Sequence, residues 1–365
     1  MIRFPGKLAL QQRVLPAYRV PFFDLLASAC DGGMSLFTGL PRPAEGIATA
    51  DKLQVATYRL GRNIHLLGGS LYLCHQRDLM DWLEEWNPDA LIVEANARYL
   101  STPAAVRWMR ERDRPVIGWG LGFPPLSGPL AGFRERRRLA FLSQFDAMIA
   151  YSQRGADEYA REGFPVDYLF VAHNSVSPSP TWELPERPES FRERPCVLFV
   201  GRLQARKNVD LLLGACAEIQ NVRLVIVGDG PERESLERLA EEIYPSAEFA
   251  GARHGAELKP WFEEADLFVL PGTGGLAVQE AMSYGLPVIV AQGDGTQDDL
   301  VREGNGWQIP PDDFEALVST MKDALSDAAR LRRMGKESYR IVKEEINIER
   351  MVETFVRALN ASSGK

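Results

Sequence analysis

The chain has 365 residues, and at that length about two domains are expected rather than a single hydrophobic core. Its 45% hydrophobic and 25% charged residues are typical of a soluble globular protein. The net charge is −8, and after residue 180 only 22 basic residues accompany 32 acidic ones. This balance argues against nucleic acid as a partner.

The first 26 residues contain no uninterrupted apolar segment long enough for a signal peptide, and no other stretch approaches the ~20 residues that span a bilayer. We therefore expect a cytoplasmic protein. The cysteines and histidines lack the paired spacing of a zinc or redox motif, so no metal and no cofactor is expected. These residues are Cys30, Cys74, Cys196 and Cys216, and His65, His75, His173 and His254.

The first half contains short apolar runs separated by helical stretches, a pattern that predicts strands of a parallel sheet. The candidate strands are MSLFTGL (34–40), DALIVEAN (89–96), PVIGWGLG (115–122), DAMIAYS (146–152) and DYLFVAH (167–173). We interpret residues 1–174 as an N-terminal α/β domain. Residues 175–195 contain five prolines and are predicted to form a linker.

The second half alternates more regularly between β-rich runs and amphipathic helices. Its candidate strands are CVLFVG, VRLVIVG, AEFAG, ADLFVLPG, PVIVA and GWQIP. Residues 196–340 are thus predicted to form a second α/β domain, and 341–365 a C-terminal helix that packs back toward the N-terminal domain. The predicted fold class is α/β, with two Rossmann-like doubly wound parallel sheets.

Three loops of the second domain follow strands that should end at one edge of its sheet, where ligands of open α/β sheets bind. The first, GRLQARKN, contains Arg202 and Lys207, the second is the glycine turn GDGPE, and the third, PGTGGL, opens a helix with Glu280 one turn inside it. Cations and glycine-rich helix starts together suit a diphosphate, and an acid can bind a ribose. Each piece also has a plainer explanation: a solvated pair of cations, a simple turn and an exposed helix acid. No GxGxxG motif is present, which weighs against a dinucleotide dehydrogenase.

In their order and spacing, VGRLQARKNVDLLLGA, VRLVIVGDGPE, ADLFVLPG, VQEAMSYGLPVI and LVREGNGWQIPPDD resemble the donor-binding half of the retaining glycosyltransferases of family four. The resemblance covers residues 195–320 well and the first half weakly. It implies the GT-B fold, in which two such domains face a central cleft. It also implies a catalytic role for Arg202 and Lys207 on the donor diphosphate and a ribose contact for Glu280. The remaining donor-side candidates are Gly201, Gly228, Gly230, Gly251, Arg253, Gly274, Gly275 and Leu276.

The activity implied by this resemblance is retaining, metal-independent transfer of a sugar from a UDP- or GDP-sugar to a glycan, a lipid-linked acceptor or a small molecule. Two positions depart from the family. Gly272 stands where relatives have a second glutamate, and Leu121 stands where many have a histidine. These departures keep two alternatives open: a non-catalytic nucleotide-sugar binder or regulatory subunit, and a GT-B-like epimerase.

Acceptor recognition is expected in the first domain, with Gly122 and three residues of a proline-flanked loop, Arg13, Tyr18 and Arg19, as candidates. Structural anchoring of that loop is an equally reasonable interpretation. The stretch GFRERRRLAF at 132–141 could bind peripherally to the inner, cytoplasmic face of an anionic membrane, where lipid-linked acceptors lie, although a solvated helix face is the favoured interpretation.

Overall fold

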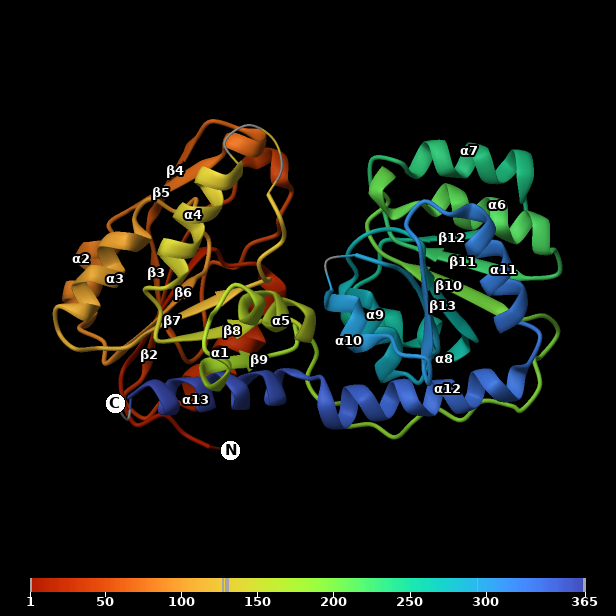
Figure 1. Ribbon diagram of the computed structural model, residues 1–365. Coiled ribbons are helices and arrows are strands. Elements are labelled where there is room, and N and C mark those ends of the chain that lie inside the picture. Colours follow the sequence, from red (N-terminus) through yellow and green to blue (C-terminus); the bar gives the residue numbers. More distant parts are fainter. Residues whose placement is uncertain (1, 127, 129–130, 294, 364–365) are drawn as a thin grey trace. The chain divides into compact units, whose positions relative to one another are not determined.

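The computed structural model describes residues 2–126, 128, 131–293 and 295–363. The chain divides into two compact units, one made of Met1–Val176 with Ile348–Lys365 and the other of Ser177–Asn347 (Figure 1). Each unit is built around its own parallel sheet, so the predicted fold class is confirmed.

The first unit contains a seven-stranded sheet in the order β3-β2-β1-β6-β7-β8-β9, with every neighbouring pair parallel. The strands are β1 (Leu8–Val14), β2 (Met34–Gly39), β3 (Thr57–Leu60), β6 (Ala90–Glu94), β7 (Val116–Gly120), β8 (Ala147–Ala150) and β9 (Leu169–Val171). Successive side chains of a strand point to opposite faces. Accordingly, Leu8 and Leu10 of β1 join one buried cluster while Ala9 joins another.

Helices cover both faces of this sheet (Figure 1). α1 (Val20–Ser28) and the chain's last helix, α13 (Ile348–Ser363), share one face, where Phe355 meets the rings of Phe22 and Trp119 at 5.0 Å. α2 (Leu79–Trp86) and α3 (Thr102–Arg110) contribute to the other face. The unit is completed by α4 (Ala131–Leu142) and α5 (Gln153–Arg161).

A separate antiparallel hairpin, β4 (Arg62–Leu66) with β5 (Leu73–Arg77), follows β3. Asn63 ties the hairpin to the carboxyl ends of β1 and β2, because its amide donates to the carbonyls of Arg13 (2.7 Å) and Leu40 (2.9 Å). The hairpin therefore belongs to the same edge of the sheet as the loops that follow the strands.

The second unit contains a six-stranded parallel sheet in the order β12-β11-β10-β13-β14-β15. Its strands are β10 (Cys196–Val200), β11 (Arg223–Val227), β12 (Glu248–Gly251), β13 (Leu267–Leu270), β14 (Val288–Ala291) and β15 (Gly306–Ile309). Its helices are α6 (Val209–Ile219), α7 (Arg233–Ile243), α8 (Lys259–Glu264), α9 (Leu276–Ser283), α10 (Thr296–Leu300), α11 (Phe314–Ala324) and α12 (Ala328–Arg340). α6, α7 and α11 lie on one side of the sheet, and α8, α9 and α12 on the other (Figure 1).

The proline-rich segment forms neither helix nor strand, as expected, but from Ser177 onward it belongs to the second unit. Trp182 stacks on Tyr284 with ring centroids 5.1 Å apart and donates its indole N–H to the carbonyl of Ser283 (3.1 Å). Arg187 donates to the carbonyls of Phe262, Ala265, Tyr284 and Gly285. Proline spacing predicts the lack of regular structure but carries no sign of these anchoring side chains.

Near the end of the chain, a π-helix spans Ile341–Glu345, and α13 begins at Ile348. The helix predicted from residue 341 therefore starts seven positions later, and it packs within the first unit. Among the helices of the described residues, none combines the length and the apolar character that crossing a membrane requires.

Candidate functional site

The candidate donor site lies at the carboxyl edge of the second unit's sheet, between β10 and β13. The strand order places the third and second strands on one side of β10 and the fourth to sixth on the other. In an open parallel sheet, this reversal leaves a crevice outside the strand ends, and ligands bind there. The loops after β10 and β13, which carry most of the predicted donor residues, meet at this point.

Lys207 is the buried cation of this edge, with 7% of its surface exposed. Its ammonium donates to the carbonyls of Thr273 (2.7 Å) and Gly274 (3.2 Å), which belong to the loop after β13. Within the described parts of the chain, no carboxylate forms an ion pair with it. Burial, helped by the charge of Arg206, lowers the pKa of Lys207 to about 8. Its positive charge is thus poorly compensated, and a bound anion would stabilise it.

The loop after β13 must be rich in glycine because it lies directly against the loop after β10. A Cβ on Gly272 would come within 2.3 Å of the carbonyl oxygen of Arg206. Gly274 has a φ of +71°, and a Cβ there would lie 3.3 Å from Arg206 Nη1 and 3.6 Å from Lys207 Nζ. Glycine at 274 therefore leaves room for both cations.

Helix α9 begins at Leu276, directly after this loop, and Gly275 at its N-cap offers no side chain to bind the first N–H groups. Such groups suit an anion. Glu280 lies in the second turn of α9 and is partly buried. Burial raises the pKa of its carboxyl group. Its carboxylate forms neither a hydrogen bond nor an ion pair with the residues the structure describes, so a ligand with hydroxyl groups would satisfy it.

The other predicted donor residues have a structural role as well as a possible ligand role. A Cβ on Gly228 would lie 1.9 Å from the carbonyl oxygen of Gly201, and one on Gly230 would lie 2.2 Å from that of Leu203. These glycines let the loops after β10 and β11 pack together, which supports the plain-turn interpretation of GDGPE. Gly251 ends β12 with a φ of +72°, in the left-handed region that glycine tolerates.

The remaining predicted cations of this unit differ from Lys207 in being exposed. Arg202 lies on the surface of the loop after β10. Arg253 follows β12, an edge strand that β11 separates from β10. Arg206, which the sequence reading missed, donates to the carbonyl of Thr273 at 3.4 Å beside Lys207. The sequence did contain a signal for Arg206, because it stands next to the predicted cation Lys207 in GRLQARKN.

The predicted acceptor residues of the first unit differ from one another in burial and in contacts. Arg13 forms an ion pair with Glu45 (2.8 Å), and its backbone N–H donates to Glu94 Oε2 at 2.9 Å. Arg19 is buried; it donates to the carbonyl of Ser175 at 3.2 Å and lies over the ring of Trp119. For these two arginines, the structure favours the anchoring interpretation, whereas Tyr18 is exposed.

Leu121 and Gly122 follow β7 at the carboxyl edge of the first unit's sheet. Gly122 has a φ of +131°, and its N–H donates to the hydroxyl of Tyr159 at 3.2 Å. A Cβ there would meet Glu158, so glycine is needed for packing. Leu121, where relatives often have a histidine, is half exposed.

Glu94 is a residue of this edge that the sequence reading missed. It ends β6, beside β1 at the reversal of strand order, and burial raises the pKa of its carboxyl group. The sequence did contain a signal for Glu94, because it directly follows the apolar run ALIV, and ligands of open sheets bind at the carboxyl ends of the strands.

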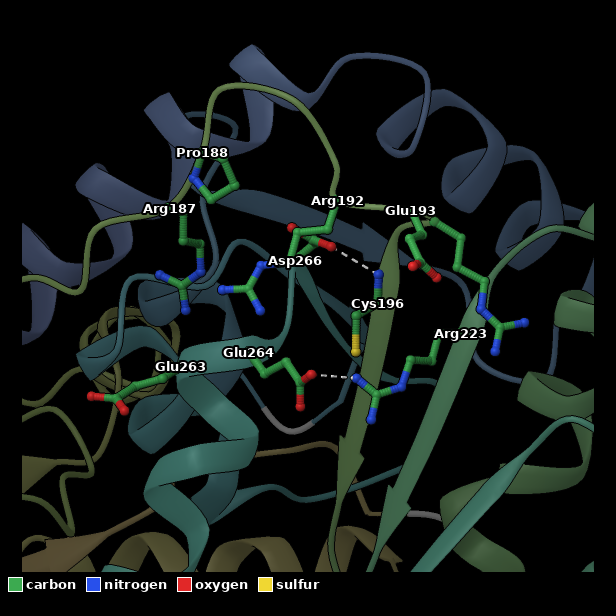
Figure 2. Close-up of a pocket in the computed structure, with 10 residues that line it drawn as sticks. Arg187, Pro188, Arg192, Glu193, Cys196, Arg223, Glu263, Glu264 and Asp266 are labelled. Atoms are coloured by element: carbon green, nitrogen blue, oxygen red, sulfur yellow. Dashed lines mark hydrogen bonds and ion pairs between the residues drawn. The ribbon is translucent and has the colours of Figure 1, made fainter.

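A charged cavity of about 370 Å³ also lies in the second unit, at the amino ends of β10 and β11 (Figure 2). It is lined by four arginines and four acids, so its charge is balanced. Arg223 is held by Glu248 and Glu264 at 2.7 Å each, and Arg187 by backbone carbonyls. Because these cations are already satisfied and the cavity lies at the opposite edge of the sheet, it does not fit a diphosphate.

Comparison with known proteins identifies a family for the second half of the chain and relatives that match a larger share of it. Residues 180–341 match the family described as "Glycosyl transferases group 1". A GDP-mannose-dependent alpha-mannosyltransferase of Mycobacterium tuberculosis is 34% identical over 60% of this chain and 57% of that protein. The protein of the same description from Corynebacterium glutamicum is 37% identical over 72% of this chain and 65% of that protein. The chain thus matches less than two thirds of the length of either relative.

Solved structures resemble the whole chain. The lipopolysaccharide outer core galactosyltransferase WaaB, in its apo form, has a TM-score of 0.69 at 17% identity, covering 97% of this chain and 99% of that one. Anabaena Alr3699/HepE in complex with UDP and glucose has a TM-score of 0.67 at 16% identity, covering 98% and 100%. At these identities the likeness establishes the fold alone, which is GT-B.

Proposed function

We propose that this chain, which belongs to the glycosyl transferases group 1 family, transfers a sugar from a nucleotide diphosphate sugar to a hydroxyl-bearing acceptor. The observation that carries the proposal is Lys207, a buried cation whose ammonium donates to carbonyl oxygens and, among the described residues, forms no ion pair with a carboxylate, beside the uncapped start of α9. A leaving diphosphate supplies the negative charge that this site lacks. The first unit would bind the acceptor and the second unit the donor.

In the proposed reaction, the bond between the anomeric carbon and the diphosphate oxygen breaks, and negative charge grows on that oxygen. The acceptor's hydroxyl oxygen bonds to the anomeric carbon, and the departing diphosphate takes the hydroxyl proton. Lys207 would stabilise this charge from a fixed position, together with Arg202 and the N–H groups at the start of α9. Glu280 would accept hydrogen bonds from the ribose hydroxyls. We further propose that the reaction needs no metal, because these groups neutralise the leaving group. We propose retention of the anomeric configuration from the resemblance to family four.

A guanosine diphosphate sugar is the first donor to test. The two relatives compared above are described as GDP-mannose-dependent, and one of the solved structures holds UDP and glucose. The experiment offers a panel of GDP- and UDP-sugars with glycan, lipid-linked and small-molecule acceptors, and it follows diphosphate release and product mass. Proton coupling at the anomeric carbon of the product then tests retention.

A non-catalytic nucleotide-sugar binder is the second candidate. It is favoured by Gly272, because the backbone of Arg206 occupies the space next to the position where relatives have a glutamate. A protein that binds donors in calorimetry but releases no diphosphate with any acceptor would fit this alternative. An epimerase would instead change the sugar's stereochemistry without an acceptor and without diphosphate release.

A further inference from the structure

The β4–β5 hairpin of the first unit differs in charge from the rest of the chain. Residues 62–77 contain two arginines and two histidines and no acidic residue, although the whole chain has a net charge of −8. Arg62 and Arg77, one on each strand, are both exposed. The hairpin is therefore a basic element on an acidic protein.

The tip of this hairpin is apolar and exposed. Leu67 is 68% exposed and Leu71 64% exposed, and Leu66 at the end of β4 is also exposed. Hydrogen bonds hold two more exposed leucines beside the hairpin. Asn63 donates to the carbonyl of Leu40 at 2.9 Å, and Leu100 donates its N–H to the carbonyl of Cys74 at 2.8 Å. The leucines exposed together at the tip mark an interaction site.

The backbone at the tip supports a role for these side chains beyond folding. Leu67 has a φ of +58°, a left-handed conformation that is unfavourable for leucine and easy for glycine or asparagine. Glycines follow at 68 and 69, so the turn is not short of flexible residues. A large apolar side chain held exposed in a strained conformation suggests selection for a contact outside the molecule.

The base of the hairpin is firmly attached, so the tip is presented on a fixed support. Gln76 donates to the carbonyl of Gln12 at 3.0 Å and to the side chain of Asn63 at 3.1 Å. Near the tip, the hydroxyl of Tyr72 hydrogen-bonds with His65 Nδ1 at 2.8 Å. The guanidinium of Arg42 lies over the ring of Tyr72, 4.6 Å from its centroid. A tyrosine beside a cation and exposed leucines is typical of the interface between water and lipid.

We propose that the leucine-tipped hairpin docks this protein onto an anionic lipid bilayer. The leucines at the tip would enter the acyl boundary, while Arg62 and Arg77, which pair at the other end of the hairpin, would meet the outer part of the negatively charged headgroup layer. Charge selects the occupant, because the hairpin contains arginines and no acidic residue and is therefore attracted to an anionic surface. The inference does not depend on the proposed sugar transfer.

The test is sedimentation of the full chain with vesicles of phosphatidylcholine alone or of phosphatidylcholine mixed with phosphatidylglycerol. We expect binding to the mixed vesicles that weakens with added salt. Leu67→Asn with Leu71→Ser should lower the partition coefficient by at least about tenfold, because two leucine side chains that would be buried in the bilayer are lost. Asparagine suits the left-handed backbone at 67, so folding is preserved. Arg62→Gln with Arg77→Gln should remove the preference for anionic vesicles.

Two controls make the result decisive. Val166→Ser changes an exposed apolar residue elsewhere in the first unit and should leave binding unchanged. Phe133→Ser changes an exposed residue of α4. It tests the arginine-rich stretch 132–141, which the sequence offers as an alternative membrane-binding surface. The proposal is overturned if the unaltered protein binds neither vesicle. It is equally overturned if the hairpin variants, with unchanged thermal unfolding, bind as the unaltered protein does; a loss of binding in Phe133→Ser would then assign the membrane contact to α4.

Discussion

The two sheets of this protein reverse their strand order at equivalent places but carry different charges there. In each unit, the first strand of the parallel sheet lies next to the fourth strand of that sheet along the chain. These neighbours are β10 and β13 in the second unit and β1 and β6 in the first, where the β4–β5 hairpin is not part of the sheet. The edge of the second unit holds Lys207, whose ammonium donates to carbonyl oxygens and, in the part of the chain that the structure describes, has no carboxylate as an ion-pair partner. The edge of the first unit holds Arg13, whose charge is neutralised by Glu45 at 2.8 Å.

This difference separates what topology provides from what loops provide. The reversal creates a place for a ligand in both units. The loops then decide its chemistry, because a desolvated cation without a counter-ion gains more from an anion than a cation that already has one. We therefore expect a diphosphate to bind at the edge of the second unit rather than at that of the first.

The largest expected effect comes from the contact between the two donor loops. Gly272→Ala places a Cβ within 2.3 Å of the carbonyl oxygen of Arg206 and 2.4 Å of the Cα of Lys207. Both are backbone atoms, so the loops must separate, and we expect a loss of about 3 kcal/mol in the free energy of unfolding. Chemical denaturation measures it.

Gly68→Ala is the matched control, because a Cβ there meets nothing within 4 Å. If Gly272→Ala is as stable as this control, the two loops are not packed as described. The same contact means that Gly272→Glu cannot simply restore the family's glutamate.

The next largest effect tests the cation. Lys207→Met keeps the length of the side chain but removes its charge, and we expect affinity for a nucleoside diphosphate to fall by about 1.5 to 3 kcal/mol. Calorimetric titration measures it. Arg13→Gln is the comparison in the first unit, and its diphosphate affinity should equal that of the unaltered protein. Equal losses in both variants would mean that the two edges do not differ as proposed.

Glu280 provides a smaller effect on the nucleoside. Glu280→Gln replaces a charged acceptor with a neutral one and should weaken binding by about 1 to 1.5 kcal/mol. The loss should appear with a ribonucleoside diphosphate and disappear with its 2′,3′-dideoxy counterpart, which lacks the hydroxyls. An equal loss with both ligands would place Glu280 away from the ribose.

Local patterns in the sequence predict the fold well, because apolar runs and amphipathic stretches are properties of neighbouring residues. They also place the candidate donor residues in loops that follow strands of one sheet. They do not separate Arg202 from Lys207, which share a loop; only packing against Thr273 and Gly274 buries the lysine.

Local sequence patterns cannot predict the hydrogen bonds and the ion pair around Arg13, because the residues that form them come from segments far apart in the chain. Glu45 follows β2, and Glu94 ends β6. Arg19 likewise looks like a loop cation until the chain folds and places it over Trp119. Long-range contacts of this kind decide which polar residues are free for a ligand.

The pH dependence of binding gives the last and smallest test of the same contrast. Burial and Arg206 lower the pKa of Lys207 from 10.5 to about 8, so the free protein loses this charge as the pH rises through 8. A bound diphosphate favours the protonated form, and affinity should therefore fall by about eightfold between pH 7.5 and pH 9.0. Lys207→Arg keeps its charge throughout this range and should bind with nearly constant affinity, which also corrects for titration of the ligand. Titrations in buffers of different ionisation enthalpy should show proton uptake on binding near pH 8.5 for the unaltered protein and none for this variant. Constant affinity in both proteins would mean that Lys207 does not meet the diphosphate, and the difference between the two edges would then have to rest on Arg202 and the start of α9.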